Sequence, residues 1–205
     1  MNMQSYLAEI KHAAEISLKA IWEEHKQVQI SKATLDRLTK QTHRDYERAE
    51  RIADSDDIDD ITMATGLHWE TYFGVDKERF NAEAFHKEQE SVLQARKFSR
   101  AALSGTVLQL AKQGISIVHG KLSDAPTGPN LKGAPLSSVI WQARNQALHW
   151  EEGSFSKSVT DCFEGMSTKW PTLSAYRDKN LAFEVVEVLG WTHYEAFEID
   201  MMSLA

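Results

Sequence analysis

The sequence predicts an all-α protein, an antiparallel bundle of about five to seven helices. Two observations carry this prediction. Apolar residues recur at intervals of three and four over most of the chain, as one stripe of a helix requires. All but one of the prolines, with several glycines, gather in the single segment 120–138. Helices of ~20 residues joined mostly by short turns bury their apolar stripes most simply in a bundle.

The N-terminal half contains three predicted helices. The first carries a stripe at intervals of three and four, formed by Leu7, Ile10, Ala14, Ser17 and Ile21. Ser31 is a suitable N-cap for a separate second helix that runs to about Asp54. The acidic stretch DSDDIDD interrupts the pattern, and a short third helix ends near Gly74.

Residues 76–120 have a helical pattern almost throughout. One unbroken helix of this length would outgrow most small bundles, so we expect a break around Ser104-Gly105. A long loop follows over 120–138, and a helix resumes at Pro135 or Leu136 and ends near Gly153.

A further helix is predicted after Ser156, and the tail can form a strand pair or two short helices around the turn LGW. We expect a single domain over 1–205, with 155–205 a possible C-terminal appendage.

Composition indicates a cytoplasmic protein, and we expect no cofactor. The chain is 42% hydrophobic and 26% charged, as is ordinary for globular domains, and its formal charge of −7 argues against a broadly basic coat. The single cysteine, Cys162, suits a reducing compartment and is expected to be a buried structural thiol. We find no secretory signal and no apolar run long enough to span a bilayer, so no membrane partner is expected.

The helix containing VIWQARNQALHW, Val139 to Trp150, has two distinct faces. One is apolar and suits a core, and it is formed by Leu136, Ile140, Ala143, Ala147 and Trp150. The other mixes aromatic, aliphatic and polar groups, and it is formed by Trp141, Arg144, Asn145, Leu148 and His149. Such a mixture is typical of a wet contact surface.

Three residues of the second face suggest chemistry. Arg144 offers forked donors suited to a phosphate, and His149 can remove or return a proton near neutral pH. Asn145 lies one turn before His149 and can hold the imidazole or a phosphate oxygen. These groups suit phosphodiester cleavage in which the 2′-hydroxyl of RNA attacks. A two-fold dimer along this face would double the small set of groups.

The stretch RNQALH, Arg144 to His149, resembles the R-x4-6-H signature of the HEPN superfamily (higher eukaryotes and prokaryotes nucleotide-binding). The Asn after the Arg matches the polar residue that active members often have. The resemblance implies an all-α bundle that dimerises, with a metal-independent ribonuclease site formed by both protomers. It also implies a toxin or defence role, sometimes with an antitoxin protein. On this interpretation Arg144, Asn145 and His149 are the catalytic residues.

Other interpretations of the motif stay open. A catalytically inactive HEPN-like module would use the same face to bind RNA, a nucleotide or a protein partner. In the simplest alternative, Arg144 pairs with a neighbouring carboxylate and His149 is an ordinary surface histidine.

A basic stripe on the predicted second helix is a candidate RNA-binding surface. Its members lie at intervals of three and four, and they are Arg37, Lys40, Arg44, Arg48 and Arg51. If the stripe faces the cleft of the predicted dimer, it could follow an RNA backbone, and its affinity for RNA would fall steeply as the salt concentration rises. The alternative is a solvated helix face, because Asp45, Glu47 and Glu50 lie nearby.

A di-metal oxidoreductase is a rival from another class. The pairs Glu9/His12 and Glu83/His86 have the Glu-x-x-His spacing of di-iron bundles. Glu9 and His12 flank the apolar stripe of the first helix, and two further inward carboxylates would be needed. We therefore expect no metal site.

Overall fold

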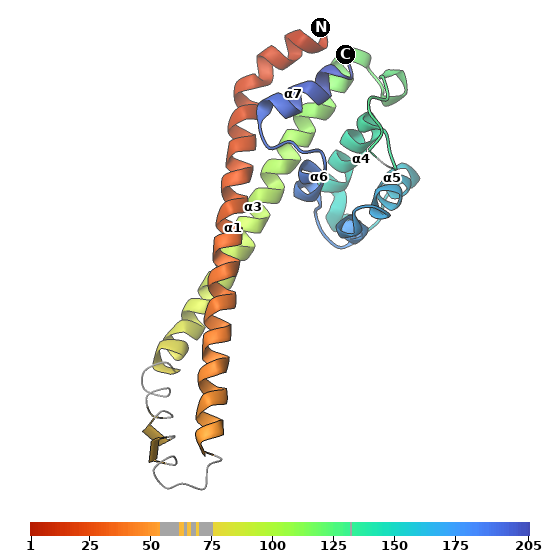
Figure 1. Cartoon of the computed structure of the whole chain (residues 1–205). Helices are drawn as coiled ribbons and strands as arrows, with labels where there is room; N and C mark the ends of the chain where they lie inside the picture. The colour runs from red at the N-terminus through yellow and green to blue at the C-terminus, as the bar shows by residue number, and fades with distance from the viewer. Residues whose placement is uncertain (54–61, 64, 67–68, 70–75, 132) are drawn as a thin grey trace. The chain divides into compact units, whose positions relative to one another are not determined.

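A computed structural model describes residues 1–53, 62–63, 65–66, 69, 76–131 and 133–205, with only part of the side chains within 35–53 and 76–89. Over these residues the chain is an all-α helical bundle without strands, as predicted. The helices are α1 (Met3–Ala53), α3 (Asp76–His119), α4 (Leu136–His149), α5 (Lys157–Ser167), α6 (Ala182–Val188) and α7 (Tyr194–Met202) (Figure 1). Short 3-10 turns are η2 (Leu122–Asp124), η3 (Trp150–Glu152) and η4 (Pro171–Arg177). None of these helices is both long and apolar enough to cross a bilayer.

Helix α1 continues without a break through Ser31, so the prediction of two separate helices is wrong. It spans 51 residues. The sequence contains no Pro before Pro126 and no Gly before Gly66, so nothing in α1 removes a helical hydrogen bond or favours a left-handed backbone. Ser inside a helix costs only a few tenths of a kcal/mol relative to better helix formers, which is too little to end one.

The predicted break at Ser104-Gly105 is also wrong, because α3 runs unbroken through both residues. The buried Ser104 hydroxyl donates to the Arg100 carbonyl, 2.8 Å away and one turn earlier, so the helix itself satisfies it. Gly105 lies against α4, where a methyl group in its place would be 3.8 Å from the Ala147 Cβ. This glycine therefore lies at a close helix–helix contact and does not mark a hinge.

The whole acidic stretch, 54–60, and most of the predicted third helix lie outside the described residues. The loop predicted over 120–138 is confirmed up to Pro135 for the described residues, apart from the short turn η2, whereas 136–138 belong to α4. The predicted helix from Leu136 is α4, followed by η3 and by Gly153 with a left-handed backbone (φ 67°). Ser156 is the N-cap residue of α5. The tail forms two short helices, and Gly190 (φ 71°) makes the turn between them.

The chain comprises two compact units. The larger consists of Met1–His25 with Phe98–Ala205, and the smaller of Lys26–Lys97. In the smaller unit, α1 contributes the buried residue Val28 and α3 the buried residue Leu93. The prediction of one domain over 1–205 stays a prediction. Within the larger unit, Phe163 and Trp191 from the tail are fully buried in the same core cluster as Ile140.

Three hydrogen bonds join distant parts of the larger unit. The Tyr6 hydroxyl donates to the Leu110 carbonyl at 2.7 Å, and the Trp22 indole donates to the Trp191 carbonyl at 2.9 Å. The Tyr194 hydroxyl on α7 donates to the Leu7 carbonyl at 3.2 Å. These bonds satisfy polar groups of large aromatic side chains that would be costly to bury unpaired. The first bond joins α1 to α3, and the other two fix α7 and the turn before it against α1.

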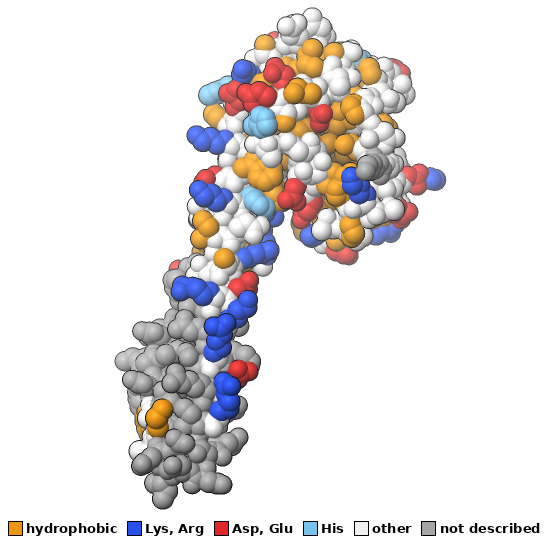
Figure 2. Space-filling model, viewed as in Figure 1, with side chains coloured by type: hydrophobic (Ala, Val, Ile, Leu, Met, Phe, Trp, Pro, Cys, Tyr) orange, Lys and Arg blue, Asp and Glu red, His pale blue; other side chains and the backbone are white. Residues whose placement is uncertain are grey.

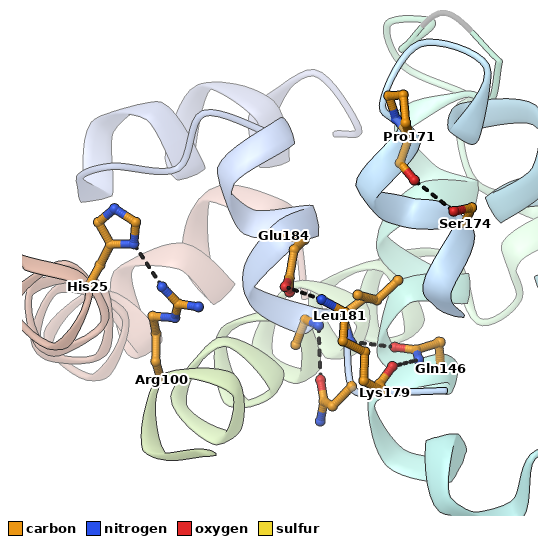
Figure 3. Close-up of polar contacts among 10 residues, drawn as sticks. His25, Arg100, Gln146, Pro171, Ser174, Lys179, Leu181 and Glu184 are labelled. Atoms are coloured by element: carbon orange, nitrogen blue, oxygen red, sulfur yellow. Dashed lines mark hydrogen bonds and ion pairs between the residues drawn. The ribbon is translucent and has the colours of Figure 1, made fainter. Parts of the chain in front are cut away.

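A further contact in the larger unit joins α1, α3 and α6. Arg100 donates from Nη1 to His25 Nδ1 at 2.8 Å (Figure 3). The guanidinium carbon is 3.6 Å from the centroid of the buried Phe183 ring, on which the His25 ring also stacks. Burial lowers the pKa of Arg100, although Glu184 and Glu187 act in the opposite direction. Because a guanidinium only donates, Nδ1 of His25 is the unprotonated nitrogen here.

Candidate functional site on α4

Helix α4 presents its apolar face to the core of the larger unit, as predicted. Leu136, Ile140, Ala143 and Ala147 are buried, and Trp150 is half-buried. The helix packs against α5 and α6. The buried face is wider than the predicted stripe, because Val139, Gln142 and Gln146 are buried as well. The motif residues are therefore held on a helix whose other side is fixed in the core.

Gln146 lies inside the motif and is completely buried. Its Nε2 donates to the carbonyls of Tyr176 at 2.8 Å and Lys179 at 2.7 Å, and its Oε1 accepts from the Leu181 backbone N–H at 3.0 Å. Figure 3 shows the amide bonded to Lys179 and Leu181 in this way. One side chain thus satisfies three backbone groups within residues 176–181, from the end of η4 to the start of α6. We call this set the Gln146 clasp.

Arg144 is half-buried and is held by two amides. Its Nε donates to Oε1 of Gln109 on α3 at 2.5 Å, and its Nη1 donates to Oδ1 of Asn145 at 3.2 Å. The Asn145 Nδ2 in turn donates to Gln142 Oε1 at 3.4 Å. These contacts use two of the five guanidinium N–H donors. Both partners are neutral, so the positive charge of Arg144 is not cancelled by a carboxylate within this network.

His149 lies at the end of α4, where the helix gives way to η3. Its backbone dihedrals, φ −125° and ψ 15°, already depart from α-helical values. Its Nδ1 is 2.7 Å from Oε1 of Glu152, and both side chains are about half exposed, at 51% and 56%. An ionised carboxylate can only accept, so Nδ1 carries the hydrogen in this contact and Nε2 is left for proton transfer.

The structure brings Arg144 and Asn145 together, whereas His149 has a partner of its own. The expectation that Asn145 holds the imidazole is therefore not met in this arrangement, because its amide bonds Arg144 and Gln142. Among the described side chains, Arg144 is bonded by two amides and by no carboxylate, so the alternative of a carboxylate partner finds no support there. The α4 face thus contains a cation held by amides and, at the end of the helix, a histidine oriented by a carboxylate.

Helices α3 and α4 contact one another through successive residue pairs. Gly105 lies against Ala147, and Gln109 bonds Arg144. One turn further, the Lys112 ammonium is 4.4 Å from the centroid of the Trp141 ring. The numbering rises on α3 as it falls on α4, as in an antiparallel helix pair. Gln109 and Lys112 therefore belong to the same surface as Trp141, Arg144 and Asn145.

The basic stripe belongs to α1 in the smaller unit. Arg37, Lys40, Arg44 and Arg51 are exposed there, while the Arg48 side chain lies outside the described part. Figure 2 shows Lys and Arg side chains following one another along this unit. Arg51 donates from Nε to the Glu47 carbonyl of its own helix at 3.1 Å.

The rival di-metal interpretation gains no support from α1, because Glu9 and His12 are both exposed. The side chains of Glu83 and His86 lie outside the described part of the chain. Within that part, no group of three or more His, Cys, Asp or Glu side chains is arranged to hold a metal ion. Cys162 is buried, as predicted, and burial raises the pKa of its thiol to about 11.

Sequence reasoning missed four side chains that bond the motif residues or lie beside them: Gln109, Lys112, Gln142 and Glu152. The signal was weak, because Gln109 and Lys112 are on another helix and approach α4 only in the folded chain. Glu152 follows His149 by three residues and was within reach of local reasoning.

No protein-family model matches the chain, and no curated protein or solved structure shows significant similarity to it.

Proposed function

We propose that the chain is a metal-independent endoribonuclease of HEPN type, of a toxin-like or defence-like kind. The observation that carries the proposal is the α4 face, with a cation held by amides and an exposed histidine paired with a carboxylate. Arg144 would bind the scissile phosphate and stabilise the charge that develops on it. Its partners Gln109 and Asn145 hold the guanidinium without neutralising it.

His149 would act as the acid/base through Nε2, with Glu152 orienting the ring through Nδ1. The RNA 2′-oxygen attacks phosphorus and gives its proton to the base. The bond from phosphorus to the 5′-oxygen breaks, and that oxygen receives a proton. The products are a 2′,3′-cyclic phosphate and a free 5′-hydroxyl, so no water is consumed in this step.

A homodimer would complete the site, because one histidine cannot hold both protonation states at once. A two-fold contact along α4 would supply a second His149, one as base and one as acid. Leu148 is 48% exposed beside His149 and offers apolar area for such a contact. The basic residues of the smaller unit, Arg37, Lys40, Arg44, Arg48 and Arg51, would bind the RNA backbone.

The test is cleavage of RNA by the purified full chain in EDTA. We expect cutting that leaves 2′,3′-cyclic ends, loss of cutting in His149→Ala and Arg144→Ala, and unchanged cutting in His193→Ala, an exposed histidine on the same unit. Light scattering should give twice the chain mass. In a host cell, expression should arrest growth, and Arg144→Ala should relieve the arrest; co-expression of a neighbouring antitoxin protein should do so too.

Two results would change the proposal. RNA that binds in EDTA but is never cut would favour the catalytically inactive module, which uses the same face to bind RNA, a nucleotide or a protein partner. Cutting that survives His149→Ala would remove the acid/base role from this residue altogether.

A further inference from the structure

The pair Lys112 and Trp141 lies directly beside the proposed phosphate-binding arginine. On α3, Lys112 follows Gln109 by three residues, and on α4, Trp141 precedes Arg144 by three. Three residues advance about 4.5 Å along a helix. The Lys112–Trp141 contact is therefore one step along the same helix pair from the Gln109–Arg144 contact. This step is comparable to the ~3.4 Å rise between neighbouring nucleotides of a helical strand.

The two side chains have the chemistry that single-stranded nucleic acid requires. Trp141 is half-buried and packs against the core cluster, and the Lys112 ammonium lies over its ring, 4.4 Å from the centroid. A base can stack on such a ring whatever its identity, because every base has an aromatic face. Lys112, also half-buried, has a flexible stem and a charge that a phosphate attracts.

Binding of a nucleotide would replace the Lys112–Trp141 contact by two new contacts, one from Lys112 to a phosphate and one from Trp141 to a base. Without a ligand, the Lys112 cation occupies the ring face of Trp141. A nucleotide that places its phosphate near Arg144 draws the ammonium away from the ring and toward the backbone, because a full anion attracts a cation more strongly than a ring quadrupole does. The freed ring face then receives the base. The same residues serve both states without a change in the backbone.

We propose that Lys112 and Trp141 form a nucleotide subsite next to the reacting phosphate, in which Trp141 stacks a base and Lys112 binds its phosphate. This inference rests on the proposed function, since the neighbouring phosphate is the one assigned to Arg144. The subsite is tolerant of base identity. Trp141 precedes His149 by eight residues, or about 12 Å along α4, so it serves a nucleotide flanking the cleaved bond.

The test is binding of a fluorescent RNA octamer with 2′-O-methyl riboses, which cannot be cut, to the full chain at several salt concentrations. Lys112→Ala should weaken binding about fivefold and lower the slope of log affinity against log salt by about 0.7, the value for one phosphate contact on a single strand. Trp141→Leu should weaken binding about tenfold at every salt concentration, and Trp141→Phe should retain most of the affinity.

The chain contains a matched control, because the Lys169 ammonium lies 4.8 Å from the Trp170 ring centroid in a second Lys–Trp pair. Lys169→Ala should bind as the wild type does. If Lys112→Ala also binds as the wild type does, with an unchanged salt slope, the subsite is wrong. Lys112→Ala alters a surface side chain, so this result does not depend on how well Trp141→Leu folds.

Failure of the subsite and failure of the nuclease proposal are distinguishable. Cutting of natural RNA by the wild type, with normal octamer binding by the variants, would overturn the subsite alone. The predicted losses of binding without any cutting would support the subsite and refute the nuclease. Absence of octamer binding by the wild type would refute the subsite, and cleavage of natural RNA would then decide the nuclease proposal by itself. A mononucleotide, 5′-AMP, is the second arm: stronger binding of 5′-AMP than of the octamer would overturn the assignment to an RNA strand.

Discussion

Replacing Gln146 by Met tests whether the Gln146 clasp stabilises the larger unit. Methionine has a similar volume and is apolar, so it leaves the buried position filled but bonds none of the three backbone groups. The Tyr176 carbonyl and the Leu181 N–H would be buried without a partner, and the Lys179 carbonyl would lose a bond in a partly exposed place. At about 1–3 kcal/mol for each buried group and less for the third, the free energy of unfolding should fall by roughly 3–5 kcal/mol.

Urea unfolding followed by circular dichroism measures this change. The control is Gln113→Met on α3, where the glutamine is exposed and the change should stay within about 0.5 kcal/mol. Gln146→Glu is a useful companion, because it keeps an acceptor for the Leu181 N–H but removes the donor and adds a buried charge. A loss below about 1 kcal/mol in Gln146→Met would refute the reasoning, since the three bonds would then contribute nothing that packing does not replace.

Three further predictions concern other parts of the larger unit. Gly133→Ala should destabilise the fold by about 2 kcal/mol or more in the same urea assay, because φ is +145° and a methyl group would be 2.5 Å from the Gly165 carbonyl oxygen; an unchanged midpoint would contradict this contact. Burial raises the pKa of Tyr6 to about 12 from 10.0, so this tyrosine ionises in the unfolded chain at a lower pH than in the folded one. Its contribution to the free energy of unfolding is therefore complete below pH 10 and should be lost between pH 10 and 12. In Tyr6→Phe the free energy of unfolding should fall less steeply over this range. If the wild type cuts RNA, Gln109→Ala should lower kcat roughly 10- to 100-fold through a misplaced Arg144, while the exposed Gln113→Ala leaves kcat unchanged.

The helix ends that could be predicted are those with a strong local signal. Leu136 follows a proline, and Gly153 has the left-handed backbone that ends the turn after α4. Ser31 looked like an equal signal, yet a serine caps a helix only where the backbone leaves helical geometry. No neighbouring Gly or Pro forces it to do so in α1. A residue suited to an N-cap is favoured where a helix already begins, but its presence does not by itself start a helix.

The polar interior of the site could not be predicted from periodicity. A helical wheel assigns polar residues to solvent, whereas Gln146 is completely buried because its partners come from Tyr176, Lys179 and Leu181. The partner of Arg144 is likewise 35 positions away, on α3. Such pairings are set by the packing of helices, so their chemistry is visible only when the chain is folded. The motif residues themselves were identifiable because they are contiguous.

The bonds that fix the α7 region against α1 have a consequence for how the protein is made. Tyr194 reaches back to Leu7, and Trp22 bonds the Trp191 carbonyl. During synthesis, α1 leaves the ribosome long before α7 has been made, so the apolar stripe of α1 is not yet covered by α7. The interior of the larger unit closes only after α7 has emerged. A nascent chain halted before that point should engage chaperones and be digested readily by protease.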